Sequence, residues 1–172
     1  MLKVFTLFAT IFIACFTQTP DLLSRQLPVV IRLNDFPEAT EFELMLRENL
    51  APKGINVITV GQMQQLFSNE SQRAALRYGS QITKNTDMNA YVEKVMTSIA
   101  TVAKRLTVTV VTDKNGLPDS CYFEVTKIPD PNRRKGTVPR IYIADSVVKK
   151  RDLMYLAKEI ATLSTIPGDS KK

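Results

Sequence analysis

The chain has 172 residues, of which 44% are hydrophobic and 23% charged, and it contains two cysteines and no histidine. This length favours a single domain, since domains most often run about 100–150 residues. The missing histidine excludes a histidine-based hydrolytic triad and a zinc site with histidine ligands, because histidine is the commonest general base near neutral pH and the commonest metal ligand. The formal net charge is +6, and a positive balance favours anionic partners or surfaces.

The first fifteen residues have the pattern of an export signal. Lys3 supplies a positive charge, and residues 4–14 form an uncharged, mostly apolar run. Such a run fits the core of a signal peptide and is shorter than the about 20 apolar residues that span a bilayer as a helix. A buried first strand or helix is the alternative, which the lack of a polar face in the run disfavours.

The exit from this run, Phe12-Ile13-Ala14-Cys15, resembles the lipobox of bacterial lipoproteins. There, a small residue precedes a cysteine that is acylated, for example with palmitate, and becomes the new first residue. The resemblance implies lipidation at Cys15, and the polar segment 16–26 would then hold the following domain close to the membrane face. The competing interpretation is ordinary signal cleavage near residues 17–19, with Cys15 removed.

The body of the chain opens with a strand, a helix and a second strand. Residues 27–33 predict an apolar strand. A helix follows, with Asp35 as the expected cap, Glu38 three residues on as in a capping box, and Gly54 as its end. Residues 55–60 are rich in β-branched side chains and predict the second strand, parallel to the first.

The middle of the chain predicts two more helices and a strand. One helix begins near Gln62 and is expected to break in the polar stretch 68–72. The next has apolar residues at helical spacing from 88 to 106. It leads into a strand at 107–112, and the Asn-Gly and Pro-Asp pairs within 113–120 indicate a turn.

Two strands and a helix complete the predicted order. Residues 121–128 alternate between apolar and polar side chains and predict a strand, and residues 138–144 predict the fifth strand. The last helix is expected to begin with Asp145 or Ser146 as its cap and to present an apolar stripe through 148–163.

The predicted order is β-α-β-α-α-β-β-β-α. It indicates an α/β (α+β) fold with a five-stranded mixed sheet in a two-layer or three-layer sandwich, because one sheet with helices packed on it would bury every apolar stripe. The domain organisation then consists of a signal peptide over 1–15, a linker over 16–26, one α/β domain over 27–165 and a polar tail over 166–172.

Residues 28–60 read PVVIRLNDFPEATEFELMLRENLAPKGINVITV. An apolar strand, an "NDF" exit, an amphipathic helix, a glycine and a second apolar strand, all behind a lipobox, resemble a group of Gram-negative envelope proteins. The group comprises the penicillin-binding-protein activator lipoproteins, the curli secretion channel subunit and the amino-terminal domain of TolB. The resemblance implies a small α/β sandwich that acts as a non-enzymatic protein-interaction module in the envelope. Pore formation is not expected, because the chain lacks long amphipathic hairpins.

Positive side chains cluster before, within and after the predicted fifth strand. The candidate partner-binding residues are Arg133, Arg134, Lys135 and Arg140, and a second group occupies 149–151. They could contact an acidic partner protein, anionic lipid headgroups or wall polymers. A solvated surface is the plain alternative. A nucleic-acid partner is not expected, because of the export signal and because no basic motif is interleaved with aromatic residues.

The remaining candidates for chemistry have structural explanations. Cys121 lies in an apolar-alternating run and is expected to be a buried structural thiol, since a nucleophilic cysteine needs a base of the histidine kind. Asp113, Asn115 and Asp119 fit a turn better than a calcium loop, because the glycine and the final glutamate of an EF-hand are misplaced. The sequence shows no paired carboxylates at a credible active site, no P-loop and no Gly-x-Ser-x-Gly motif. We therefore expect no enzyme, with no catalytic residues, no cofactor and no metal.

The sequence thus predicts a non-enzymatic lipoprotein that serves as a protein-interaction module in envelope assembly or secretion. Its expected location is the periplasmic face of a bacterial membrane. The outer membrane is preferred, because Phe16, and not an aspartate, follows Cys15. The alternative is an exported soluble module that binds an anionic polymer or a lipid surface.

Overall fold

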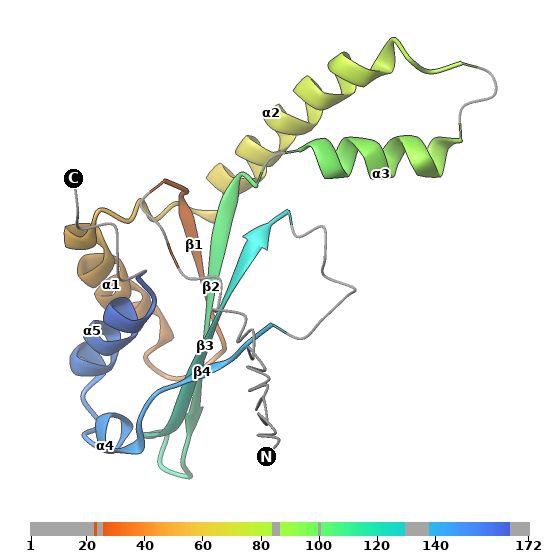
Figure 1. Cartoon of the computed structure of the whole chain (residues 1–172). Coiled ribbons are helices and arrows are strands. Elements are labelled where there is room, and N and C mark those ends of the chain that lie inside the picture. Colours follow the sequence, from red (N-terminus) through yellow and green to blue (C-terminus); the bar gives the residue numbers. More distant parts are fainter. Residues whose placement is uncertain (1–22, 24–25, 84–86, 100, 130–137, 166–172) are drawn as a thin grey trace, which may run out of the picture.

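The computed structural model describes residues 23, 26–83, 87–99, 101–129 and 138–165. A sheet of four strands, in the order β1-β2-β3-β4, forms its centre (Figure 1). β1 (Val29–Leu33) is parallel to β2 (Ala103–Thr112), which pairs antiparallel with β3 (Pro118–Ile128). β4 (Ile141–Tyr142) is antiparallel to β3 at the other edge. The predicted mixed α/β class is therefore confirmed, with an open sheet of four strands.

The helices take two different positions relative to this sheet (Figure 1). Helices α1 and α5 lie side by side over one face, whereas α2 and α3 form a pair that extends away from the sheet beyond the start of β2. The helical elements are α1 (Ala39–Leu50), the 3-10 turn η1 (Ala51–Lys53), α2 (Val60–Gly79), α3 (Met88–Ser98), α4 (Asp145–Val148) and α5 (Leu153–Leu163).

The core lies between the sheet and the α1–α5 layer. Alternate residues in the middle of β2 and β3 are buried there, as the period-2 pattern of a strand requires: Leu106, Val108 and Val110, and Cys121, Phe123 and Val125. Phe123 is fully buried, and the Phe36 and Phe42 rings meet edge to face with centroids 5.8 Å apart. The largest fully buried side chains are Phe42, Phe123, Leu23, Leu46, Leu50, Leu106, Leu156, Ile160, Val29, Val108, Val110 and Val148.

The side chain of Asn34 extends the pairing of β1 with β2. Its Nδ2 donates to the carbonyl oxygen of Val110 at 2.9 Å, and its Oδ1 accepts from the Val110 N–H at 2.8 Å. The amide therefore continues the ladder by one position after Leu33, where the chain turns toward α1.

The start of α1 differs from the prediction and its end agrees. Glu38 occupies the N-cap position without a side-chain capping bond, and Asp35 lies outside the helix, so the predicted capping box is wrong. Instead, the Phe36 carbonyl accepts from the Ala39 N–H at 3.1 Å. Gly54, with φ of 75°, follows η1 in the left-handed conformation that glycine adopts at low cost, as predicted.

The predicted second strand at 55–60 is reduced to one bridge. Val57 pairs with Val29 in parallel, through bonds of 2.8 Å from the Val29 N–H to the Asn56 carbonyl and from the Ile58 N–H to the Val29 carbonyl. The five-stranded sheet was therefore wrong, since this segment contributes too few pairs to form a strand.

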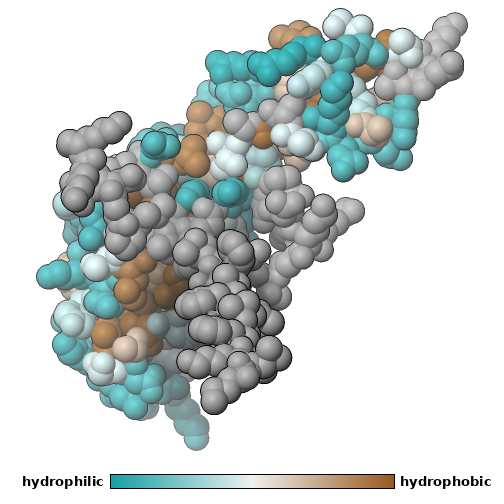
Figure 2. Space-filling model, in the orientation of Figure 1, coloured by the Kyte–Doolittle hydropathy of each residue, from teal (hydrophilic) through white to brown (hydrophobic). Residues whose placement is uncertain are grey.

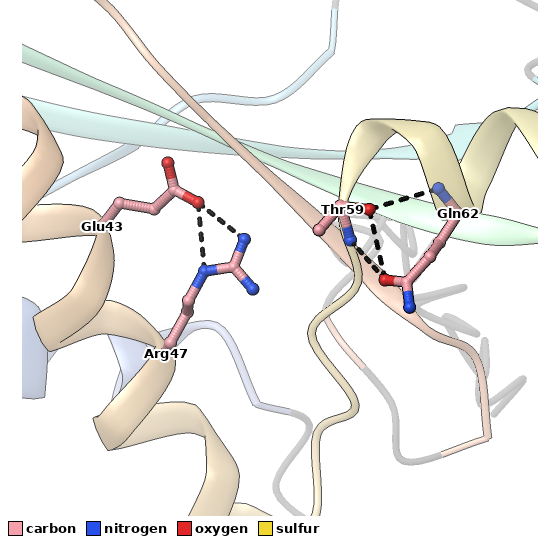
Figure 3. Close-up of polar contacts among 4 residues, drawn as sticks. All are labelled: Glu43, Arg47, Thr59 and Gln62. Atoms are coloured by element: carbon pink, nitrogen blue, oxygen red, sulfur yellow. Dashed lines mark hydrogen bonds and ion pairs between the residues drawn. The ribbon is translucent and has the colours of Figure 1, made fainter.

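The cause of this shortening is a helix cap (Figure 3). The Thr59 hydroxyl accepts from the Gln62 N–H at 3.2 Å, and the Gln62 side chain accepts from the Thr59 N–H at 2.9 Å. Because of this reciprocal capping box, α2 begins at Val60, and this β-branched residue is the first residue of the helix and not part of a strand.

Helix α2 runs without the predicted break at 68–72. It is solvated on most sides, with Ala74 as its buried residue, so polar side chains are tolerated there. Within the stretch, Glu70 pairs with Arg73 one turn further on, which supports the helix.

Helix α3 is shorter than predicted, because it ends at Ser98 and β2 already begins at Ala103. Leu106 fits both a helical and an alternating pattern. Its burial against the core in β2, together with the pairing on both sides of that strand, favours the strand.

The carboxyl-terminal part also differs in detail. β4 keeps two of the seven residues predicted for the fifth strand, and the last helix is divided into α4 and α5. Arg151 lies between them with φ of 55°, a conformation that interrupts a helix, and Asp152 then caps α5 by accepting from the Tyr155 N–H.

Candidate functional site

The face of the sheet opposite α1 and α5 provides the candidate site, which we call the open sheet face. Its residues alternate with the buried core residues along each strand, so the strand register places them on one surface. They are Arg32 on β1, Arg105, Thr107 and Thr109 on β2, Tyr122, Glu124 and Thr126 on β3, and Tyr142 on β4.

One end of this face forms a pocket of about 620 Å³ with the helical pair. The helical side comes from Met63 and Phe67, one turn apart on α2, and from Met96 on α3. The full lining is Arg32, Met63, Gln64, Phe67, Met96, Arg105, Thr107, Glu124, Thr126, Lys127, Ile128, Pro129 and Val138. This volume lies within the range of small-molecule sites.

Beside the pocket lies an aromatic–arginine cluster, formed by Tyr122, Glu124, Arg140 and Tyr142, which shares Glu124 with the pocket lining. The two tyrosine rings lie with centroids 5.4 Å apart, and the Arg140 guanidinium sits 4.8 Å from the centroid of the Tyr122 ring. The Arg140 Nε donates to the Glu124 Oε1 at 2.9 Å. This bond is the main reason that the pKa of Arg140 lies above its ordinary value.

The structure places one of the four predicted partner-binding residues in this cluster. Arg140 is exposed and is held against Tyr122 and Glu124. Arg133, Arg134 and Lys135 lie outside the described residues, as does the predicted lipidation site Cys15.

The second basic group, at 149–151, makes local contacts. The pairs are Lys149 with Asp145 at 3.7 Å, Lys150 over the Tyr155 ring at 3.8 Å, and Arg151 with Asp113 at 3.4 Å. These contacts tie the segment to its own turn and to the β2–β3 connection, which agrees with its interpretation as a solvated surface.

Asp113 acts in the turn between β2 and β3, whereas Asp119 lies within β3. The Asp113 Oδ1 accepts from the backbone N–H groups of Leu117 at 3.0 Å and Asn115 at 2.8 Å, which lowers the pKa of that carboxyl group. Gly116 follows with φ of 78°. The turn interpretation is thus confirmed for Asp113, and the described part of the chain contains no group of three or more histidine, cysteine or acidic residues that could hold a metal.

Cys121, on β3, belongs to the hydrophobic core and is 1% exposed. Burial raises the pKa of its thiol to about 12. The predicted buried thiol is confirmed, and such a group is a poor nucleophile near neutral pH.

Sequence reasoning missed the pocket and both tyrosines of the cluster. Alternation along 121–128 already placed Tyr122 and Glu124 on one face, which the structure confirms. That Arg32 joins this face from β1 depends on a parallel register between distant segments, which no local pattern reveals.

The fold and the site define a mixed α/β protein whose sheet carries helices on one face and a pocketed, partly cationic surface on the other. Comparisons with protein-family models, with curated proteins and with solved structures find no match to the chain. Among the helices in the described ranges, none combines the length and hydrophobicity needed to cross a bilayer.

Proposed function

We propose that the chain is a non-enzymatic cell-envelope lipoprotein that binds another envelope protein through the aromatic–arginine cluster on its open sheet face. The observation that carries this proposal is the exposure of Tyr142, whose surface is 66% accessible although its ring packs beside that of Tyr122. A large exposed aromatic side chain beside a second tyrosine and an arginine supports the proposal of an interaction surface.

The chemistry of the cluster suits protein recognition. Tyrosine and arginine are enriched among the residues that dominate binding energy at protein interfaces. The bond to Glu124 and the contact with Tyr122 hold the Arg140 guanidinium in one place, so less side-chain entropy is lost on binding. A partner with an acidic group opposite Arg140 and a flat apolar surface opposite Tyr142 would be complementary.

The sequence supplies the cellular setting of the proposal. The lipobox-like end of the apolar run supports lipidation at Cys15 and export to the periplasmic face of a membrane, with the outer membrane preferred. The short segment 16–26 would keep the cluster close to that membrane, so the partner is a protein at the same surface.

The test is capture of envelope proteins by the folded chain carrying single substitutions. Tyr142→Ala and Arg140→Ala are expected to reduce capture of the partner about tenfold or more, the loss that corresponds to about 1.4 kcal/mol. Tyr155→Ala is the matched control, because Tyr155 is also exposed but belongs to α5. Equal capture by all three variants would overturn the assignment to this cluster.

Charge reversal at Arg133, Arg134 and Lys135 belongs to the same test. It is expected to weaken capture and leave the melting temperature nearly unchanged, because surface charges contribute little to stability. The alternative function, an exported soluble module for an anionic polymer or lipid surface, predicts instead salt-sensitive sedimentation with wall fragments or anionic liposomes.

A further inference from the structure

The pocket between the open sheet face and the helical pair has a polar end and an apolar end. The strand register orders them along β2. Thr107 is paired with Arg32 on one side and Glu124 on the other, whereas Ala103 is paired with Ile128. Since a strand rises about 3.3 Å per residue, the two ends are separated by roughly 13 Å.

The apolar end has a packed floor. Val30, Ile58 and Ala103 form a small buried cluster there, with Met63 and Ile128 packed against it. Phe67 and Met96 line the pocket above this floor. Methionine side chains are flexible and polarizable, so they adapt to an alkyl chain of variable shape.

The apolar surface continues beyond the pocket along α3. Met88, Val92 and Met96 lie four residues apart and are 54%, 52% and 37% exposed, and this spacing aligns them on one side of the helix. Figure 2 shows that the mainly hydrophilic surface of the helical pair is interrupted by hydrophobic patches, one of them near the start of α2. This stripe gives a long chain room to extend past Met96.

The polar end carries cationic groups suited to a single negative charge. Arg32 and Thr107 line it, and Arg105 lines the pocket two residues along β2 toward the apolar end. Lys127, next to Ile128, is a third cationic residue of the lining. A guanidinium can bind a carboxylate through two parallel hydrogen bonds. Glu124 lines the same end and would repel a doubly charged head group more strongly than a singly charged one.

From these four observations we propose that the pocket binds a fatty acid, with its carboxylate at Arg32 and its alkyl chain between Met63, Phe67 and Met96. The charge of the polar end matches the head, and the apolar floor and the α3 stripe match the chain. The pocket shares Glu124 with the aromatic–arginine cluster, but Tyr122, Arg140 and Tyr142 are not part of its lining, so the two proposals can be tested with different substitutions.

In the first experiment, the folded chain is titrated with dodecyl compounds below their critical micelle concentrations, and isothermal titration calorimetry measures the binding. Dodecanoate is expected to bind at least tenfold more tightly than dodecanol or dodecylamine, because only its head matches Arg32. Comparison of dodecyl phosphate with dodecanoate tests whether the pocket prefers a carboxylate or a phosphate head group. The proposal is overturned if dodecanoate does not bind, if dodecylamine or dodecanol binds equally well, or if the phosphate binds more tightly than the carboxylate.

The second experiment fills the pocket. Thr107→Trp places a large ring in the pocket and is expected to weaken dodecanoate binding at least tenfold. Thr109→Trp is the matched control, because Thr109 lies on the same face of β2, two residues further on, outside the pocket lining. Equal affinity of the two folded variants would contradict the proposed position of the chain.

A third variant keeps the test decisive if Thr107→Trp fails to fold. Arg32 is exposed, so Arg32→Gln leaves the core intact, and it is expected to lower dodecanoate affinity about fivefold or more. Arg77→Gln, an exposed arginine of α2 outside the pocket, is its control and is expected to bind normally. Unchanged affinity in Arg32→Gln refutes the head-group assignment. Tyr142→Ala is expected to bind dodecanoate normally. A failure of the partner-binding proposal can therefore be distinguished from a failure of the fatty-acid proposal.

Discussion

Cys121 shows how one buried atom changes the chemistry of a residue. Its surroundings in the core disfavour the charged thiolate, and the pKa of the thiol rises to about 12. We expect iodoacetamide at pH 8 to modify Cys121 at least tenfold more slowly in the folded chain than in the urea-unfolded chain. Mass spectrometry of the peptide that contains Cys121 measures both rates, and comparable rates would contradict the burial.

The same pKa shift makes stability depend on pH. The Cys121 thiol holds its proton more tightly in the folded state than in the unfolded state. Its contribution to the free energy of unfolding is therefore fully present below the pKa of the unfolded thiol, near 8.5, and is lost as the pH rises toward 12. The melting temperature of the native chain should therefore fall more steeply between about pH 9 and pH 11 than that of Cys121→Ala.

The side-chain amide of Asn34 makes the two hydrogen bonds to Val110 that a backbone amide would make in a sheet. Replacing it with alanine removes both bonds to Val110, and each such bond contributes about 0.5–1.5 kcal/mol. We expect Asn34→Ala to lower the free energy of unfolding by about 1–3 kcal/mol in urea denaturation. Asn49→Ala is the control, since the Asn49 amide donates to the Met45 carbonyl of its own helix and to the Met154 sulfur of α5, and neither bond joins two strands. A larger loss in the control would argue against the bridging role.

At the scale of elements, the capping box of Thr59 and Gln62 determines where the extended segment ends and α2 begins. Thr59→Ala removes the hydroxyl that accepts from the Gln62 N–H, at a cost of about 1 kcal/mol. Because α2 extends from the body, we expect the loss to emerge as faster amide hydrogen exchange in its first turn. Gln65→Ala, an exposed position of the same helix, should leave that exchange unchanged.

How far the elements could be predicted depended on which interactions define them. The alternation in 121–128 and the glycine at 54 are local signals, and both predictions are confirmed. The segment 55–60 has a strand composition, yet Thr59 and Gln62 begin a helix there. The boundary between α3 and β2 was misplaced because Leu106 satisfies both periods and pairing with distant strands decides between them.

The candidate site was predicted less completely than the fold, for a related reason. Arg140 was identified from its charge, whereas Tyr142 and Arg32 reach the same face only through the pairing of β4 and β1 with their neighbours. Local sequence carries no information about that register when the paired segments are far apart.

At the scale of the whole molecule, the first prediction concerns the amino terminus of the mature protein. Expressed with its own first fifteen residues in a Gram-negative host, the chain is expected to begin at Cys15 and to carry acyl chains. Intact mass and the mass of the first peptide measure both properties. An unmodified terminus beyond Thr17 would discard lipidation and make the exported soluble module the better proposal.

The parallel pairing of β1 with β2 also sets an order of events in folding. On a ribosome, β1 emerges roughly 70 residues before the strand that it pairs with, and α1, α2 and α3 are made in between. The antiparallel hairpin of β2 and β3 closes over a short turn, so it can form as soon as both strands are available. β1 is therefore expected to pair only after β2 has been made, and until then Val29, Val30 and Ile31 are an apolar segment not yet buried in the sheet, which is the kind of segment that makes folding intermediates prone to aggregate.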